Sequence, residues 1–126
     1  MTGKIVADTL EHSTAGSIAT NYVVEGSAKA WARFDTSTTT VLNDGLNVST
    51  LTDLGTGNTQ INLTNSMGNT TYAVLGLCQY QSNAGQTIME GPSDIATGSY
   101  EVYTKTNSNS PFDADFNSTA VHGDLA

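Results

Sequence analysis

The sequence predicts an all-β fold, a single antiparallel β-sandwich that could take a jelly-roll-like form. Composition is the first reason: the 126 residues include 20 Thr, 12 Ser, 11 Asn and 12 Gly, while only 13% are charged. This mixture suits strands and turns and is poor in the residues that build helices. With 37% hydrophobic residues, the chain has enough apolar side chains for one modest core and one domain.

Short alternating segments between turn motifs are the second reason. Two such motifs are Asn43-Asp44-Gly45 and Gly55-Thr56-Gly57. An Asp-Gly pair tolerates the positive φ angles of a tight turn, so we expect a hairpin between strands in Thr38–Asn43 and Leu46–Thr52. A second turn is expected at the paired glycines.

Further strands are expected along the chain, at residues 28–35, 60–64, 72–81, 99–106 and 118–126. The near-continuous apolar run within Tyr72–Gln81 predicts a strand buried on both faces. Ser99–Thr106 alternates instead, which predicts one buried and one solvated face.

The chain divides into an attachment arm, residues 1–25, and a β-sandwich, residues 26–126. The arm has two short apolar pieces, Ile5–Val6 and Tyr22–Val24, separated by small and polar residues. This pattern fits two strands or an extended segment and predicts no helix of any length. In the sandwich, loops are expected at 82–98 and 106–117.

Alternation gives the strand from Ala28 to Asp35 two different faces. One face carries Ala28, Ala30, Ala32 and Phe34, and its small side chains allow another sheet or another chain to pack closely. The other face carries Lys29, Trp31 and Arg33, so the indole could be flanked by cations in a contact patch for a glycan or a partner protein. A packing role for Trp31 is the alternative.

The charge balance excludes several partners. With a net charge of −8 and only four Lys and Arg, sequence-independent binding to nucleic acid is not expected.

No stretch approaches the length of a membrane span, and no secretory leader is recognisable. The single Cys78 cannot form an intrachain disulfide and is expected in the core. A weakly charged Thr/Ser/Asn exterior favours association of subunits through β-surfaces.

No constellation in the sequence indicates catalysis, a metal or another cofactor, so we expect a protein that is not an enzyme. Asp113-x-Asp115-x-Asn117 resembles the start of a calcium loop, but Ser118 replaces the turn glycine and the closing glutamate is missing. His12 and His122 have no second ligand at metal-binding spacing. No Gly-x-Ser-x-Gly motif is present.

Four stretches of the chain resemble the short fibre module of tailed bacteriophages, especially those of marine bacteria. They are GSAKAWARFD (Gly26–Asp35), TVLNDGLNVSTLTDLGTGNTQINLTNSM (Thr40–Met67), NTTYAV (Asn69–Val74) and VHGDLA (Val121–Ala126). The similarity covers residues 20–80 well. The chain departs from the pattern at Arg33, where a small polar residue is common, and just after Asp35, where Thr and Ser replace a glycine-containing turn.

The resemblance implies a structural protein of the virion, made in the host bacterial cytoplasm, that forms a homotrimeric fibre or spike. Residues 1–25 would attach it to tail or capsid proteins, and the loops would face the host surface. A capsid decoration or head fibre protein that clamps capsid subunits is one alternative. A carbohydrate-binding module is another, with Trp31, Tyr80, Tyr100 and Tyr103 as stacking platforms for sugar rings.

Overall fold

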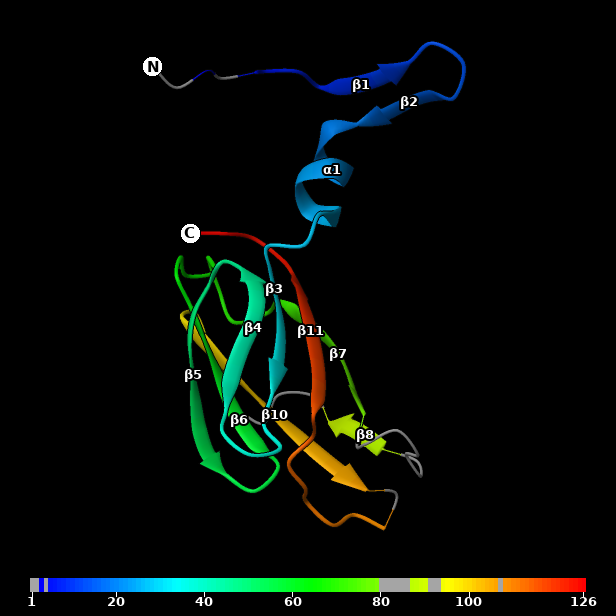
Figure 1. The fold of residues 1–126 in the computed structure, drawn as a ribbon. Coiled ribbons are helices and arrows are strands. Elements are labelled where there is room, and N and C mark those ends of the chain that lie inside the picture. Colours follow the sequence, from blue (N-terminus) through cyan, green and yellow to red (C-terminus); the bar gives the residue numbers. More distant parts are fainter. Residues whose placement is uncertain (1–2, 4, 80–86, 91–93, 107) are drawn as a thin grey trace.

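The computed structural model describes residues 3, 5–79, 87–90, 94–106 and 108–126, and most of its regular structure is antiparallel strand (Figure 1). An all-β fold built from antiparallel sheets is therefore confirmed. A body of two sheets follows an N-terminal arm that leads away from it in Figure 1.

The arm contains a small hairpin and a short helix. Its elements are β1 (Thr9–His12), β2 (Gly16–Ala19) and α1 (Thr20–Gly26). The prediction that the arm contains no helix is therefore wrong. The helix forms although its Val23 and Val24 are β-branched residues with weak helix propensity and no side chain caps its N-terminus.

Sheet I of the body has the strand order β4-β3-β11-β7. Its strands are β3 (Ala30–Asp35), β4 (Val41–Leu46), β7 (Ala73–Gln79) and β11 (Phe116–His122). The last strand in the sequence thus lies between β3 and β7, where it ties the start of the body to its middle.

Sheet II has the order β5-β6-β10-β8, and β9 also pairs with β10. Its strands are β5 (Val48–Gly55), β6 (Asn58–Leu63), β8 (Thr87–Glu90), β9 (Ile95–Ala96) and β10 (Ser99–Thr106). The expected turn at Gly55 and Gly57 joins β5 to β6, and both glycines have positive φ, 125° and 71°.

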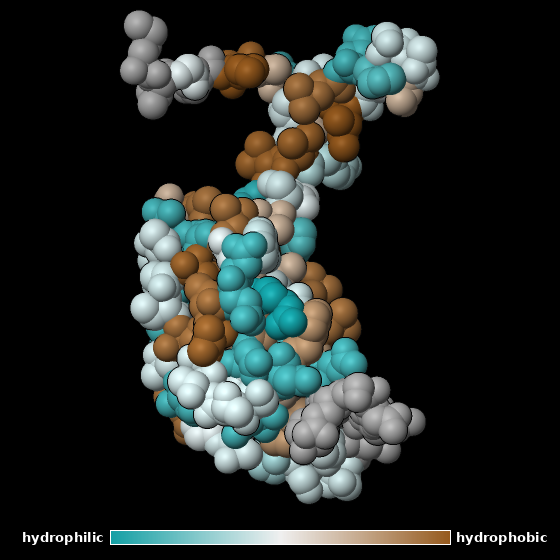
Figure 2. Space-filling view, viewed as in Figure 1, coloured by the Kyte–Doolittle hydropathy of each residue, from teal (hydrophilic) through white to brown (hydrophobic). Residues whose placement is uncertain are grey.

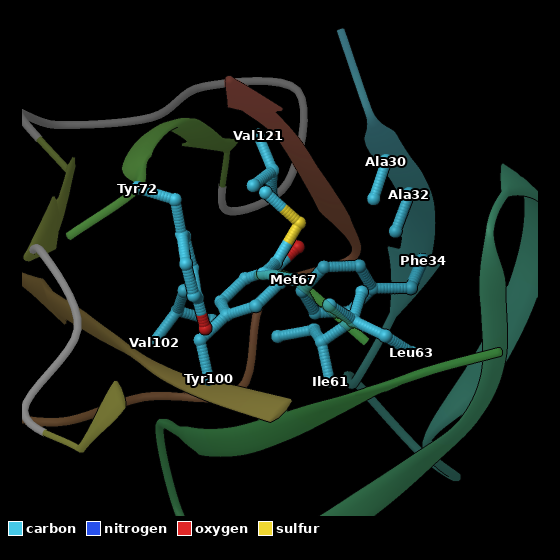
Figure 3. Packing of buried hydrophobic residues seen from close by; sticks show 10 residues of the cluster. All are labelled: Ala30, Ala32, Phe34, Ile61, Leu63, Met67, Tyr72, Tyr100, Val102 and Val121. Atoms are coloured by element: carbon cyan, nitrogen blue, oxygen red, sulfur yellow. The ribbon is translucent and has the colours of Figure 1, made fainter. Parts of the chain in front are cut away.

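Both sheets contribute side chains to one buried cluster, shown in Figure 3. Sheet I supplies Ala30, Ala32, Phe34 and Val121, and sheet II supplies Ile61, Leu63, Tyr100 and Val102; Met67 and Tyr72 from the β6–β7 connection complete it. Burial alternates residue by residue along β3, β6, β10 and β11. The inward positions are thus those that a period of two predicts, including the single solvated face expected for 99–106.

The prediction of a hairpin turn at Asn43-Asp44-Gly45 is wrong. Strand β4 runs through these residues and pairs with β3, whereas β5 pairs with β6 in the other sheet. The register shifts between Arg33 and Phe34, which makes the Asn-Asp-Gly motif part of a β-bulge. The chain turns between the sheets at Asn47, whose φ is 57°. Gly45 serves a close approach, since a Cβ there would lie 2.9 Å from the carbonyl oxygen of Trp31.

The prediction that the strand in Tyr72–Gln81 is buried on both faces is also wrong. β7 lies at the edge of sheet I, and its Leu75 and Leu77 are 57% and 73% exposed. Its alternate residues Val74 and Cys78 are half-buried. The apolar run is continuous in the sequence, but within the part of the chain that the structure describes no second layer covers the outer side.

The expected loop at 82–98 is only partly a loop. Within it, Thr87–Glu90 and Ile95–Ala96 are strands that both pair with β10. Residues 82–86 and 91–93 lie outside the described part of the chain, as does Tyr80. Of the second expected loop, 106–117, residue 107 is not described, Lys105 and Pro111 form an isolated bridge, and β11 begins at Phe116.

Candidate interaction surfaces

The arm leaves its hydrophobic side chains uncovered. Exposed large hydrophobic residues lie along its whole described length: Ile5, Val6, Leu10, Ile18, Tyr22, Val23 and Val24. The first two are 91% and 81% exposed, and α1 contains no buried residue. A groove of about 360 Å³ between the extended start of the arm and α1 is lined mainly by these side chains. Such an array is unusual for a segment that stays alone in water.

Hydrogen bonds nevertheless give the arm a defined local form. The Thr20 hydroxyl donates to the carbonyl oxygen of Ala7 at 2.7 Å, and the Thr20 amide donates to that of Asp8 at 2.9 Å. These bonds hold the extended residues before β1 against the start of α1.

A second set of hydrogen bonds fixes the junction between arm and body. The Lys29 ammonium donates to the carbonyl oxygen of Val24, near the C-terminus of α1, and to the Ser27 hydroxyl at 2.9 Å. A cation at this end of a helix is favourable because the last carbonyl groups carry partial negative charge. On β11, His122 Nδ1 lies 3.1 Å from the carbonyl oxygen of Gly26, a donor arrangement for the Nδ1–H tautomer. The junction of arm and body is thus held by Lys29, just before β3, and by His122 of β11.

The outer face of sheet I carries a row of hydrophobic side chains across its four strands. Register places Leu46 of β4 opposite Trp31 of β3, and Trp31 and Leu75 on either side of Ala120. Leu46, Trp31 and Leu75 are 50%, 36% and 57% exposed. In the next row Ser118 lies between Arg33 and Leu77. Figure 2 shows hydrophobic surface beside β7 and along the β4 side of the body, with hydrophilic side chains between.

The cations expected beside Trp31 have other partners. The guanidinium carbon of Arg33 lies 3.7 Å from the centroid of the Phe116 ring, a cation–π contact. Arg33 also donates to Asn43 Oδ1 at 3.4 Å, and Lys29 is bound at the arm junction. Lys29, Trp31 and Arg33 do share one outward face, as alternation predicts, but the indole is flanked there by Leu46 and Ala120.

The outer face of sheet II is polar. Asn62 donates through Nδ2 to the hydroxyl groups of Thr50 and Thr52 at 3.1 and 3.0 Å, and Gln60 donates to Asn62 Oδ1 at 2.8 Å. Next to this row, Asn58 Nδ2 donates to the hydroxyl of Tyr103 at 2.9 Å. These side chains largely satisfy one another, so the described residues of β5, β6 and β10 present a polar, solvated surface here.

The small-residue face of β3 packs inside the molecule. Ala30, Ala32 and Phe34 are 0%, 1% and 0% exposed and pack against sheet II, while Ala28 is half-buried. These positions allow the close approach of the second sheet, so a neighbouring chain cannot reach them in the folded body.

Tyr100 cannot be a sugar-stacking platform, because it is fully buried in the core. Its hydroxyl is hydrogen-bonded to that of Thr119 at 2.8 Å, and its ring meets Tyr72 edge to face at 6.4 Å. Burial raises the pKa of Tyr100 to about 12, because the phenolate would lose its hydration. Tyr103 is half-exposed on sheet II, with the Lys105 ammonium 5.7 Å from its ring centroid.

The candidate metal ligands do not converge in the described residues. Asp113 Oδ1 accepts a hydrogen bond from the Gly57 amide at 2.7 Å, whereas the Asn117 side chain is fully buried and donates to the Ala114 carbonyl at 3.0 Å. His12 Nδ1 accepts from the Ala15 amide in the arm hairpin. Within the part of the chain that the structure describes, no three His, Cys, Asp or Glu residues form a potential metal site.

Leu46, Leu75 and Leu77 were not predicted as surface residues. The signal for the last two was present, since they alternate with Val74, Gly76 and Cys78. Alternation alone could not say which of two apolar faces is covered.

Comparison with protein-family models, with curated proteins and with solved structures found no match. Among the described residues, no helix has the length and hydrophobicity needed to cross a membrane.

Proposed function

We propose that this protein is a non-enzymatic structural component of a bacteriophage virion, a small β-sandwich that assembles as a homotrimeric fibre or spike. Residues 1–25 attach it to tail or capsid proteins, and the loops within 82–98 and 106–117 face the host surface. The resemblance to short fibre modules in Gly26–Asp35 and Thr40–Met67 supplies the class of protein.

One observation carries the proposal: the arm has a defined form but leaves its large hydrophobic side chains exposed. Hydrogen bonds that are exposed to water add little stability to the arm. Its apolar side chains would gain free energy if another surface covered them, because burial removes them from water. That is the behaviour required of an attachment segment. The hydrophobic outer row of sheet I adds a second surface suited to contact between subunits.

A capsid decoration protein is the alternative that the same observation favours, since a projecting arm could clamp neighbouring capsid subunits. Immunogold labelling distinguishes the two locations. Antibodies raised against the purified chain are applied to intact phage particles from the source host. We expect label on the tail, whereas label on the head would replace the fibre with the decoration protein. Particles that carry no label, and no peptide of this chain by mass spectrometry, would overturn the virion assignment.

The carbohydrate-binding alternative retains one structural support, the half-exposed Tyr103 among polar side chains on sheet II. Trp31 is exposed on the other sheet, so the two aromatic rings do not form one platform. A glycan array probed with the wild type and Tyr103→Ala tests it. Binding lost in the variant would favour a sugar-binding module, and absence of any binding by the wild type would exclude one for the glycans on the array.

A further inference from the structure

We infer that the arm of one copy docks on the outer face of sheet I of a second copy, so that subunits associate by arm exchange. This inference rests on the homo-oligomer proposed above and names the two surfaces that join it. The hydrophobic side of the arm then contacts a second copy, and tail or capsid proteins would bind the remaining surface of residues 1–25. The arm surface is Ile5, Val6, Leu10, Val23 and Val24; the receiving surface is Trp31, Leu46, Leu75 and Leu77 around Ala120 and Ser118.

Hydrophobicity matches on the two surfaces. Each leaves several large apolar side chains partly or almost fully exposed, and together they would remove much of this area from water. The small side chains of Ala120 and Ser118 lower the middle of the receiving face between Trp31 and Leu75 on one row and Arg33 and Leu77 on the next.

Charge favours this face over the rest of the body. By sequence the arm carries three acidic residues, Asp8, Glu11 and Glu25, against one cation, Lys4. On the outward side of sheet I, Lys29 just before β3 and Arg33 of β3 balance Asp35 and Asp44, so the charges of this face cancel. The remainder of the body has seven acidic residues and one lysine, so an acidic arm meets less repulsion on the outer face of sheet I than elsewhere.

The direction of the arm selects a second copy over the chain's own body. The bonds from Lys29 to Val24 and from His122 to Gly26 hold the end of α1 at the edge of the body. From there the hairpin extends away from sheet I, as Figure 1 shows. Folding back onto its own sheet would break these bonds, whereas a neighbouring sheet can be reached with the junction intact.

The dimensions are also compatible. The six- and seven-residue strands of sheet I span about 20–23 Å, and the four-residue strands of the arm span about 13 Å. A contact between the arm and the face can be reciprocal in a twofold dimer, or it can run head to tail and close into a ring. Three copies related by a threefold axis would each donate one arm and receive one.

The test uses the full-length chain and its natural probe, Trp31, the one tryptophan in the sequence. Light scattering and tryptophan emission are followed along a dilution series. We expect an oligomer whose emission shifts to the red as dilution exposes Trp31. Leu75→Gln/Leu77→Gln should raise the concentration of half-dissociation about 100-fold, as expected for removing two leucines from a buried contact. Ile5→Gln/Val6→Gln should have a similar effect and shift the emission at fixed concentration.

Matched controls lie on sheet II. Leu54→Gln changes an exposed leucine, 44%, on the other sheet and should leave the oligomer unchanged. Arg33→Gln should weaken association, whereas Lys105→Gln should not. All variants change exposed or half-exposed positions, and circular dichroism verifies that they fold.

The outcomes separate this inference from the proposed function. An oligomer that loses assembly only with the arm variant, while the Leu75→Gln/Leu77→Gln variant stays assembled, would show that arms pack with one another and would overturn the inference alone. A wild type that is monomeric, with unchanged Trp31 emission at every concentration, would overturn both the inference and the homotrimer. Dissociation by both variants, with no label on phage particles, would support arm exchange and reject the virion assignment.

Discussion

The arm and the two-sheet body use similar residues in opposite ways. Both contain valine, isoleucine and leucine, yet Ile61 and Val121 of the body are fully buried while Ile5 and Val6 of the arm are almost fully exposed. The body closes its inner hydrophobic faces by packing its two sheets together, whereas no layer among the described residues covers the arm. The pattern of apolar residues thus defines a face of a strand or helix, and the tertiary structure shows whether the chain itself covers that face.

The largest expected difference between the two regions is in core packing. Phe34→Ala should lower the free energy of unfolding by about 3–5 kcal/mol, because it leaves a cavity between the sheets. Val24→Ala, in the arm, should change the unfolding of the dilute monomer by less than about 0.5 kcal/mol. Urea unfolding across a dilution series measures both, since association stabilises the folded chain by mass action. Equal losses in the two variants would contradict the comparison.

Two glycines with positive φ, one in the body and one in the arm, provide a second test of the difference between these regions. Gly57→Ala places a Cβ 2.6 Å from the Thr104 carbonyl oxygen and 2.9 Å from the Phe112 amide, both backbone atoms. Backbone strain alone should cost about 1–3 kcal/mol, with the steric clash in addition. Gly16→Ala in the arm hairpin has a φ of 93° but meets open space, so the unfolding temperature of the body should not change. Calorimetry measures the unfolding temperature of both variants. If Gly16→Ala lowered it as much as Gly57→Ala does, the expected difference between arm and body would be wrong.

Alkaline unfolding should report on one buried phenol. The pKa of Tyr100 is raised from 10.0 to about 12 by burial, so the folded state holds this proton more tightly than the unfolded state. Its contribution to stability is fully present below pH 10 and is lost as the pH rises to about 12, by up to about 2–3 kcal/mol. Tyr100→Phe should remove this part of the decline, measured by urea unfolding at each pH. Tyr22→Phe, which changes an exposed tyrosine of the arm, should keep the decline of the wild type.

The smallest expected effect concerns the junction. Lys29→Gln removes the ammonium group from the C-terminal end of α1 and should cost less than about 1 kcal/mol of stability. Its main consequence should be faster amide hydrogen exchange in residues 20–26 of the dilute monomer, with exchange in β3 and β11 unchanged. Lys105→Gln is the control and should alter neither. Protection of α1 that stays equal to that of the wild type would mean that Lys29 does not hold the arm.

Several elements could be predicted from local sequence. Period-two alternation correctly identified the inward residues of β6 and β10, because a strand points successive side chains to opposite sides. The paired glycines at 55 and 57 identified the β5–β6 turn, because their positive φ angles suit a residue without Cβ. On β3, alternation correctly placed Lys29, Trp31 and Arg33 opposite the alanines.

Other predictions failed where the answer depended on distant parts of the chain. Asn43-Asp44-Gly45 satisfies the local requirements of a hairpin turn, but pairing of β4 with β3 and of β5 with β6 places it in a bulge. Tyr100 was predicted to be a surface aromatic residue, yet sheet I covers it and its hydroxyl group is hydrogen-bonded to that of Thr119 on β11. Arg33 lies over Phe116, a residue 83 positions later that no local pattern connects to it.

The sequence by itself determined an antiparallel all-β chain, the two faces of its alternating strands and the presence of an apolar N-terminal segment. These are properties of backbone geometry and residue type within a few positions. The tertiary structure decided which faces are covered: the alanine face of β3 is closed by sheet II, whereas the leucines of β7 and the apolar side chains of the arm stay exposed. The reason is physical, since burial depends on strand pairings between distant segments, and the same apolar side chain is core or contact surface according to what those pairings bring against it.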